Sequence, residues 1–485
     1  MNFCVKHKSI IVTGILFAIV YASISLVNHY NFRTYALDLG LYTHAAYKYA
    51  HFKVADSTMI KSFQESMLGG HFDMYLVLLS PLIFLLGTYS LLIIQIIAIL
   101  FGGLGIYTFF LHLDTSNKKT PLYAAILFYS FFGVFGAISF DYHSVVVASC
   151  LIPWFFVSIW RGTKIQSILL LLFILIAQEN VSLWLAFICL ALVIEHRRNK
   201  KQVTFLLFLS GISLLYFSSV ITWIIPFFSA HHAYSGFNYS SIGSNMFEAM
   251  QTILREPFRC AEILFTNHTK NPFGDFVKTE LHVLLLTSGL PLLLKKPHFI
   301  LMLLPIYFQK LFHDNYAMWG IGMHYSIEFA PILAIGIFMV LSELRSEKTR
   351  EILSYVVLIF VIGSTFRTMD STIFFTDKAK LRFYQKDHYQ RIYDVKSIHH
   401  NLAKIPSDAI VSAQSPFVPH LALRESIYQF PLIKNAEYIV YSKKEKSYPL
   451  TQKEFDEEIS KLENLTEWEI FYSGEVIILK KSSKK

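Results

Sequence analysis

Long apolar segments alternate with short polar loops along most of the chain. A helix that crosses the hydrocarbon core of a membrane needs about 20 apolar residues, within a range of about 17–25. The pattern therefore predicts a polytopic α-helical membrane protein. The clearest apolar segments are 9–27, 89–111, 121–140, 143–160, 205–229, 298–312, 327–343 and 351–366.

Charge in the loops decides how the more ambiguous apolar stretches are arranged. Cytoplasmic loops of membrane proteins carry an excess of lysine and arginine. If the short stretch 72–86 crossed the membrane, every later basic loop would lie on the side opposite Lys6 and Lys8. We therefore predict that 72–86, which contains Pro81, is a juxtamembrane helix. The basic loops that this arrangement places inside are 118–119, 161–164, 197–201, 295–296 and 345–350.

The stretch 165–195 has basic clusters at both ends, so a single crossing would put one of them outside. Two crossings keep both inside, and we predict a helical hairpin with Gln178-Glu179-Asn180 at its apex. Residues 281–312 likewise predict two short spans that meet at a cytoplasmic turn. The total is about eleven transmembrane helices, with the N-terminus inside and the C-terminus outside. The predicted outer loops are 28–88, 139–144, 178–180, 230–280 and 313–326.

A domain boundary is predicted near residue 370, because hydropathy falls and charge rises after Phe366. The transmembrane domain would cover 1–369, and its outer loop 28–88 would carry the juxtamembrane helices. A small extracytoplasmic α/β domain would cover 370–485. It has no glycine-rich phosphate loop and no nucleophile elbow, so we expect a lid or an acceptor-binding role.

Elements of this soluble domain follow from its local patterns. Helical spacing of Phe455, Ile459 and Leu462 predicts one helix, and Ser473-Gly474 predicts the turn of a hairpin. Apolar runs and alternation predict the strands. The predicted strands are 409–414, 426–430 and 437–442, the helix is 451–465, and the hairpin is 468–481.

Composition agrees with the membrane prediction. Of the 485 residues, 54% are hydrophobic and 16% are charged, whereas soluble domains carry about 25% charged residues. The net charge is +9, but the basic excess sits in the short loops, so orientation in the membrane explains it and we expect no nucleic-acid partner. Cys4, Cys150, Cys189 and Cys260 lack metal-ligand spacing.

The polar residues that stand out fall on the predicted outer side, although lysines and arginines alone set the topology. Glu179 is the hardest to explain structurally. Each hairpin arm covers roughly 21 Å of a core about 30 Å thick, so the apex lies below the surface and needs a partner or a water-lined cavity. Together these residues predict an extracytoplasmic polar cavity. They are Asp38, His71, Asp141, His143, Glu179, His324, Tyr325 and Glu328.

Most of these residues also have a purely structural explanation. Asp38 can cap a helix that begins at the next residue. Asp141 and His143 can be solvated turn residues, and His71 after two glycines can mark a tight turn. Glu328 can extend toward water from the mouth of its span.

Carboxylates in such a cavity have two plausible chemical uses. They can remove a proton from an acceptor hydroxyl, or they can bind a divalent metal that neutralises a phosphate. Oxygen ligands with histidine suit Mg²⁺ or Mn²⁺ better than zinc. Asp38 and Asp141 are the candidate metal ligands.

Several motifs, taken in order, resemble a bacterial family of predicted membrane proteins known as domain of unknown function 2079. They are RTYALDLGLYTHAAY, GGHFDMYLVLLSPLIFLLG, FDYHSVVVA, AQENVSLWLA and GMHYSIEFAP, and the tail segment IPSDAIVSAQSPFVPHLALRESIYQFP is similar to the family's extracytoplasmic end. The family looks like a branch of the GT-C superfamily, whose members transfer sugars from polyprenyl phosphates. The resemblance covers most of the chain.

The resemblance implies a multi-pass protein of the cytoplasmic membrane that uses a lipid-linked sugar as co-substrate. An essential acid near the start of the first outer loop matches Asp38, which would be the catalytic base or a metal-site acid. Glu179 matches the acid of a Lys-Glu apex, but Gln178 replaces the lysine. Arg33 and the neighbouring histidines would stabilise the departing phosphate.

Two other functions remain open at this stage. A transporter or lipid flippase also needs charges within the membrane, but we see no inverted repeat of broken helices. A non-catalytic envelope assembly protein would use the tail as its binding module. Under that hypothesis, Asp38 and Glu179 should tolerate substitution while tail residues should not.

Overall fold

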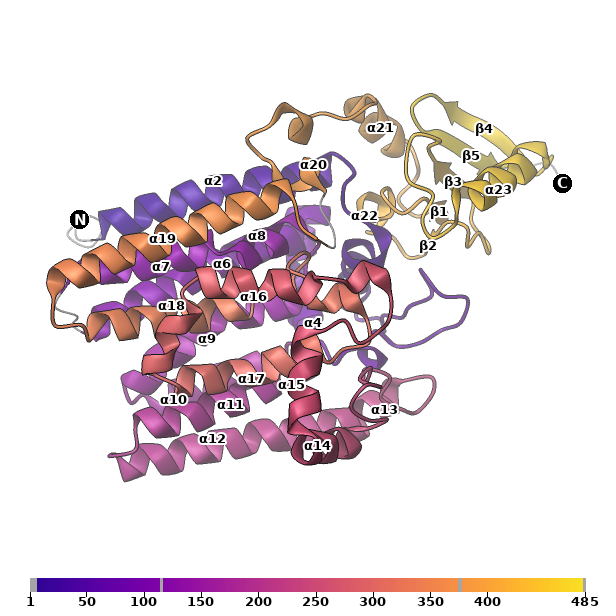
Figure 1. Cartoon of the computed structure of the whole chain (residues 1–485). Coiled ribbons are helices and arrows are strands. Elements are labelled where there is room, and N and C mark those ends of the chain that lie inside the picture. Colours follow the sequence, from indigo (N-terminus) through magenta and orange to yellow (C-terminus); the bar gives the residue numbers. More distant parts are fainter. Residues whose placement is uncertain (1–6, 114–116, 374–376, 483–485) are drawn as a thin grey trace.

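The computed structural model describes residues 7–113, 117–373 and 377–482. Cys4 and Lys6 lie outside these described residues, as do 374–376 and 483–485 of the predicted soluble domain. The described chain is mostly helical with a small sheet near its C-terminus. The long helices run side by side, and the sheet stands at one end of this bundle (Figure 1).

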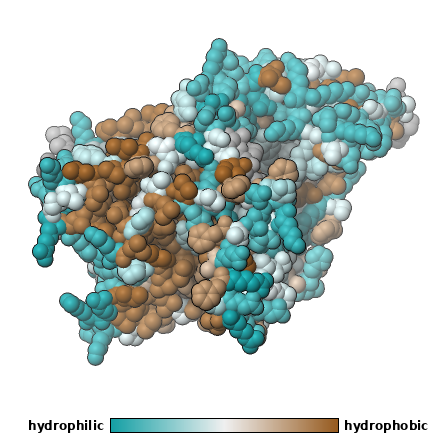
Figure 2. Space-filling model, in the orientation of Figure 1, coloured by the Kyte–Doolittle hydropathy of each residue, from teal (hydrophilic) through white to brown (hydrophobic). Residues whose placement is uncertain are grey.

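Among the described residues, four helices are long and apolar enough to cross a membrane. A fifth is formed if α7 (Thr120–Ser130) and α8 (Phe132–Ser139) count as one span bent by 45°. Hydrophobic side chains cover much of the bundle's flank, while the surface around the sheet is hydrophilic (Figure 2). The four helices are α2 (Lys8–Tyr30), Tyr75–His112 ending in α6 (Ser90–His112), Lys200–Phe228 beginning with α12 (Lys200–Ser219), and α19 (Glu347–Asp370).

Most of the other predicted crossings are apolar helices of 10–17 residues. Measured by length, the described part therefore holds fewer span-length helices than the predicted eleven. The physical reason is burial inside protein: residues 329–341 of α18 are all buried, and a short apolar helix is typical of a core as well as of a membrane. These helices are α9 (Ser144–Trp160), α10 (Lys164–Leu175), α17 (His298–Leu311) and α18 (Phe329–Ser342).

The prediction of a hairpin in 165–195 is confirmed. The stretch forms α10 and α11 (Glu179–Glu195), separated by residues 176–178. The rings of Trp160, just before α10, and His196, just after α11, lie 4.8 Å apart at their centroids, so the hairpin begins and ends at the same place. Lys296 Nζ also lies there, 3.3 Å from Glu195 and 2.8 Å from Glu343.

The stretch 72–86 forms short helical pieces: α4 (Tyr75–Leu79), η3 (Ser80–Leu82) and α5 (Ile83–Leu86). Gly87 then has a φ of 58°, a backbone conformation that most other residues rarely adopt. This conformation separates α5 from the helical turns that lead into α6. The stretch is nevertheless apolar enough to be counted with α6 as one long helix. Its position at the membrane interface stays a prediction.

Short helices make up the loops between the long ones. They are η1 (Ala36–Gly40, a π-helix), α3 (Leu41–Ala50), η2 (Met67–Gly69), η4 (Gly87–Tyr89), η5 (Val220–Ile224), α13 (Ile225–Phe228), α14 (Met246–Arg255), α15 (Pro257–Phe265), η6 (Pro272–Gly274), α16 (Val277–Thr287), η7 (Leu290–Lys295), η8 (Tyr316–Trp319), α20 (Lys378–Leu381), η9 (Lys386–Tyr389), α21 (Val395–Leu402) and α22 (Val418–Leu421).

The C-terminal sheet has the strand order β2-β1-β3-β5-β4. β1 is parallel to β2 and β3, and β5 is antiparallel to β3 and β4. All five predicted strands are present, and the predicted helix buries Phe455, Ile459 and Leu462 as its spacing indicated. The elements are β1 (Val411–Ala413), β2 (Ile427–Gln429), β3 (Tyr438–Tyr441), α23 (Gln452–Asn464), β4 (Trp468–Ser473) and β5 (Ile477–Lys481).

The C-terminal part shares a hydrophobic core with residues 28–88, the predicted first outer loop. Phe32, Ala36 and Met59 from that loop are buried together with Val411 and Phe417 beside the sheet. Gly40 makes this approach possible, because a Cβ there would lie 2.9 Å from a methyl group of Val418. The tail thus packs directly on the segment that carries Asp38.

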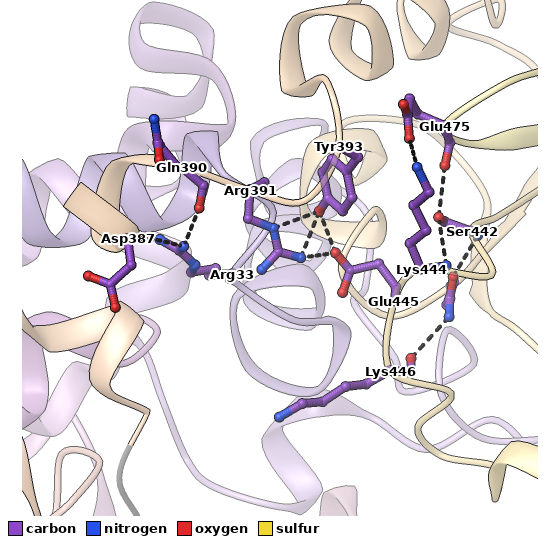
Figure 3. Close-up of polar contacts among 11 residues, drawn as sticks. Arg33, Asp387, Gln390, Arg391, Tyr393, Ser442, Lys444, Glu445, Lys446 and Glu475 are labelled. Carbon is purple, nitrogen blue, oxygen red and sulfur yellow. Dashed lines mark hydrogen bonds and ion pairs between the residues drawn. The ribbon is translucent and has the colours of Figure 1, made fainter.

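Polar contacts surround the same junction (Figure 3). The guanidinium of Arg391 pairs with Glu445 and donates hydrogen bonds of 3.0 and 2.8 Å to Tyr393 Oη. Gln414, directly after β1, donates to the carbonyl oxygen of Lys446 (3.0 Å). The loops at the carboxyl ends of β1 and β3 are thereby fixed to one another.

Two glycines of α8 admit a backbone segment from far along the chain. A Cβ on Gly133 would lie 2.3 Å from the carbonyl oxygen of Ser326, and one on Gly136 would lie 2.6 Å from that of Met323. Real Cβ contacts are not this close, so a larger residue would push the segment 323–327 away. That segment holds two of the predicted site residues, His324 and Tyr325, and ends directly before a third, Glu328.

We predict that Gly133→Ala destabilises the protein by about 1–3 kcal/mol, the usual cost of overpacking. Gly211→Ala in α12 is the matched control, because no atom lies within 4 Å of the added Cβ and alanine is the better helix former. Thermal unfolding of the purified variants in detergent compares the two. Equal midpoints would show that the contact between α8 and 323–327 is loose.

Candidate active site

A cavity of about 510 Å³ is formed by six segments that are far apart in the sequence. They come from the first outer loop, the GGHFD segment, the FDYHS turn, the hairpin apex, residues 234–239 and residues 306–328. Two of the nine predicted site residues, Arg33 and Asp141, do not line it. The seven that do are Asp38, His71, His143, Glu179, His324, Tyr325 and Glu328.

Asp38 sits on the π-helical turn η1, directly before α3. Asp141 fixes this turn from behind, because its Oδ2 accepts hydrogen bonds from the backbone N–H groups of Tyr35 (3.1 Å) and Leu39 (3.3 Å). Asp141 is only 1% exposed. The side chain of Asp38 keeps 23% of its surface accessible and lines the cavity.

His143 is the nearest ionisable partner of Asp38, with 3.5 Å between Nε2 and Oδ1. The Nδ1 atom of His143 lies 3.2 Å from the carbonyl oxygen of Asp141. A carbonyl oxygen only accepts, so Nδ1 carries a hydrogen and Nε2 of the neutral ring is the unprotonated nitrogen. Nε2 is thus the ring nitrogen that faces Asp38.

The FDYHS turn also binds the GGHFD segment. Ser144 Oγ donates a hydrogen bond of 2.6 Å to Asp73 Oδ2, and Asp73 Oδ1 accepts from the backbone N–H of Tyr75 (2.9 Å). Backbone N–H of His143 donates to Gln95 Oε1 (3.0 Å), which ties the turn to α6. One short turn thus connects two outer segments and a long helix.

Glu179 and His71 form the second acid–histidine pair of the cavity. His71 Nδ1 lies 2.8 Å from Glu179 Oε1, and the backbone N–H of Phe72 donates to Oε2 (3.4 Å). The carboxylate of Glu179 is 2% exposed, whereas His71 exposes about half of its side chain. The predicted partner of the acid at the apex is therefore a histidine from the first outer loop.

A further side of the cavity is formed by the segment before α18. The ring of His324 stacks on that of His143, with centroids 3.6 Å apart and planes at 21°. Lys310 on α17 holds the segment in place by donating to the carbonyl oxygens of Met318 (2.8 Å), Gly320 (2.6 Å) and Tyr325 (2.7 Å).

Several cavity residues were not among the predicted ones. Asp73 stands in the GGHFD motif, where its acid was available as a signal. Lys310 lies in an apolar stretch, and a cation there is itself a sign of function or of a buried partner. Aromatic side chains in an apolar sequence carry no such signal; those that line the cavity include Tyr42, Tyr49, Trp184, Tyr234 and Tyr239.

Arg33 has a structural position. Its guanidinium donates to the backbone carbonyl oxygens of Asp387 and Gln390, each at 2.9 Å (Figure 3). It also donates to that of His388. It is 3% exposed. Arg33 therefore holds the segment after α19 against the first outer loop and does not line the cavity.

Asp38 and Asp141 are the two predicted metal ligands. Asp141 Oδ1 is buried and has no hydrogen-bond partner among the described residues, so it is a spare oxygen near Asp38. Within 7–113, 117–373 and 377–482, however, no three His, Cys, Asp or Glu side chains are grouped to hold a metal ion. Asp38 and Asp141 alone do not make a complete ligand set.

The surroundings of Asp73, His71 and His324 shift the pKa values of these side chains. Burial raises the pKa of Asp73 to about 6, although the hydrogen bond from Ser144 acts in the opposite direction. Partial loss of hydration lowers the pKa of His71, but the adjacent Glu179 carboxylate raises it, and the net shift is upward. Burial beside His143 lowers the pKa of His324 well below its usual value, so that ring is neutral.

The titration of Asp73 gives a testable pH dependence. An unfolded aspartate has a pKa of about 3.9, and folding raises that of Asp73 to about 6. The folded state then binds the proton more tightly, so this group's contribution to stability falls as the pH rises from about 4 to about 6. We expect Asp73→Asn to gain stability relative to the wild type over that interval and to keep a constant difference above it.

Thermal unfolding at several pH values measures this difference, with Asp370→Asn as the control, because the Asp370 side chain is 61% exposed. If the stability of the wild type instead rose relative to that of Asp73→Asn as the pH rises, the folded state would stabilise Asp73 as a carboxylate.

Two solved structures have a similar overall shape at low sequence identity. The oligosaccharyltransferase of Archaeoglobus fulgidus in its apo form is 9% identical, with 89% of this chain and 69% of that chain covered and a TM-score of 0.46. The arabinofuranosyltransferase AftD from Mycobacteria is 12% identical, with 99% and 40% covered and a TM-score of 0.48. At such scores the likeness carries no functional weight.

No curated protein sequence matches the chain significantly. A family model does match it, over residues 28–478, and this range includes all seven cavity residues named above. The chain therefore belongs to the family of predicted membrane proteins called DUF2079.

Proposed function

We propose that this protein is a membrane glycosyltransferase that moves a sugar from a lipid-phosphate donor to an acceptor outside the cytoplasm. The observation that carries the proposal is the cavity, in which two acid–histidine pairs face a common space at one end of an apolar bundle. A donor with a lipid tail and a polar sugar needs both environments side by side. The acceptor would be a glycan, lipid or protein of the cell envelope.

Asp38 is the proposed catalytic base. It lines the cavity, keeps part of its side chain accessible, and lies 3.5 Å from Nε2 of His143. The acceptor hydroxyl would give its proton to Asp38 while its oxygen attacks the anomeric carbon. The bond from that carbon to the phosphate oxygen breaks, and its electron pair leaves with the lipid phosphate. Attack opposite the leaving group inverts the anomeric centre.

His71 and Glu179 are proposed to serve the donor side. His71 exposes about half of its side chain and is held by Glu179, which favours its protonated form. A protonated imidazole can donate a hydrogen bond to the departing phosphate. Tyr325 and Glu328 line the same wall and are proposed to contact the sugar hydroxyls.

A divalent ion, Mg²⁺ or Mn²⁺, remains part of the proposal only as an addition brought by the substrate. Asp38 and the spare oxygen of Asp141 would supply two ligands, and a donor phosphate would have to supply more. Such an ion would neutralise the phosphate.

The proposed topology has the N-terminus inside, the C-terminus outside and about eleven helices in or across the membrane, several of them short. The C-terminal domain at 370–485 would then stand over the outer face. Its shared core with Phe32 and Met59 supports a role as a lid or an acceptor-binding module.

A flippase would use the same apolar bundle and polar cavity. A sugar-transfer assay separates the two functions.

The base assignment predicts that Asp38→Asn lowers sugar transfer by about 100-fold or more, the usual contribution of a general base. The assay uses purified protein in liposomes with radiolabelled polyprenyl-phosphate sugars and an envelope extract as acceptor. Asp370→Asn, on an exposed carboxylate, should keep wild-type activity. Undiminished transfer by Asp38→Asn would contradict the assignment, and lipid movement without any transfer would favour a flippase.

The pair at the apex predicts non-additive effects. Glu179→Gln and His71→Asn should each reduce transfer, and the double variant should lose little more than either alone. The expected coupling energy is about 0.5–3 kcal/mol, typical of side chains in direct contact. Strictly additive losses would mean that the two residues act separately.

A further inference from the structure

The outer loop between α13 and α16 contains two short helices, α14 and α15. The start of α14 is firmly defined: Asn245 Oδ1 accepts from the backbone N–H of Glu248 (3.0 Å), and the Glu248 carboxylate accepts from the backbone N–H and hydroxyl of Ser244 (2.8 Å each). These contacts satisfy groups that a helix start otherwise leaves unpaired.

α14 is strongly amphipathic. At 100° per residue its apolar side chains occupy one continuous arc, and Glu248, Gln251, Thr252 and Arg255 occupy the other. The apolar positions are Met246, Phe247, Ala249, Met250, Ile253 and Leu254.

The protein covers only one edge of this apolar arc. Ala249 and Ile253 pack in a small cluster with Ile242, Cys260 and Phe312. The other edge is uncovered, and its apolar surface continues onto α15. The uncovered residues and their exposed fractions are Phe247 (69%), Met250 (57%), Leu254 (79%), Phe258 (91%) and Phe265 (63%).

The position of these helices matches a membrane surface. α15 runs across the direction of the long helices and lies toward the end of the bundle that carries the sheet (Figure 1). The span-length helix at Lys200–Phe228 leads into this loop, and its last turns expose Trp223 (71%) and Phe227 (76%). Exposed aromatic rings near the end of a span are typical of the level where hydrocarbon meets the headgroups.

We propose that α14 and the start of α15 lie in the outer surface of the lipid bilayer, with Phe247, Met250, Leu254 and Phe258 inserted among the acyl chains. A helix of this composition binds an interface through its apolar face while its polar face stays in water. The loop follows a span-length helix whose last turns expose Trp223 and Phe227, which favours lipid over a protein partner as the occupant of this face.

This anchor would set the height of the cavity in the membrane. The segment just before α14 is tied down by Asp314, which accepts from the backbone N–H of Ser240 (2.9 Å) and donates its own N–H to the carbonyl oxygen of Asn238 (2.9 Å). Tyr234 and Tyr239 of the same segment line the cavity. A bilayer-bound α14 therefore places this rim at the headgroups, whether or not the cavity transfers sugar.

The test compares nitroxide labels on two neighbouring residues in opposite environments, Leu254→Cys and Arg255→Cys. The background is Cys4→Ser, since Cys150, Cys189 and Cys260 are buried. The full chain is reconstituted in vesicles of phosphatidylcholine and phosphatidylglycerol, and collision rates are measured with oxygen and with a water-soluble nickel chelate. The label at 254 should collide several-fold more with oxygen than with nickel, and the label at 255 should show the reverse.

A label on Lys453→Cys, whose side chain is 88% exposed on α23, gives the value for water. Nickel collision at 254 as frequent as at 453 would overturn the proposal. Shielding of 254 from both reagents that grows with protein density would also overturn it, because a second copy would then cover the face. Thermal midpoints equal to that of the background protein show that each labelled variant is folded.

Discussion

The carboxylate of Asp141 accepts hydrogen bonds from the backbone of Tyr35 and Leu39, and the geometry of the cavity depends on this contact. A buried carboxylate is costly unless it is hydrogen-bonded, so the turn η1 has little freedom to move away. Asp38 lies between the two anchored amides, and its direction is set by them. The same FDYHS turn offers His143 to Asp38 and Ser144 to Asp73.

Close backbone approach makes this arrangement possible. Gly133 and Gly136 let the segment 323–327 lie directly on α8, which brings His324 onto His143. Lys310 fixes that segment and the turn before it through the carbonyl oxygens of Met318, Gly320 and Tyr325. The short helices α9, α10, α17 and α18 pack around this polar region.

The C-terminal part is coupled to the same turn. It shares a core with Phe32 and Ala36, immediately before Asp38, and Arg33 holds the segment after α19 by backbone carbonyls. Movement of the C-terminal part would therefore change the position of η1. This coupling gives a soluble domain without catalytic motifs a physical means to affect the cavity.

Much of the architecture could be predicted because each signal was local. Basic loops on both sides of 165–195 required a hairpin, and alternation along 409–442 indicated strands that the structure contains. The charges of the loops placed the candidate residues on one side of the membrane, and seven of these residues line one cavity. Eleven crossings were predicted, several of them short, and four or five of the described helices have the length of a span. Sequence alone does not separate these cases, because an apolar run of 15 residues looks the same whether lipid or protein surrounds it.

What the sequence did not indicate depends on contacts between distant segments. Asp141 and Arg33 were expected in the site, but whether a charged side chain meets a substrate or a backbone group is decided by tertiary packing. The sequence shows Lys310 as a cation in an apolar stretch, but it does not show that its partners are carbonyl oxygens of residues 318–325. Aromatic wall residues such as Trp184 and Tyr234 look like any others in a chain with 16% aromatic residues.

The central claim is that the cavity receives a lipid-linked sugar next to Asp38. A cryo-electron microscopy structure of the full chain in nanodiscs, with a non-transferable polyprenyl-phosphate sugar analogue, tests it most directly. The account predicts sugar density in the cavity, with the anomeric carbon facing Asp38 and the phosphate near His71. Density bound elsewhere, or a cavity that stays empty while the analogue occupies another site, would contradict it.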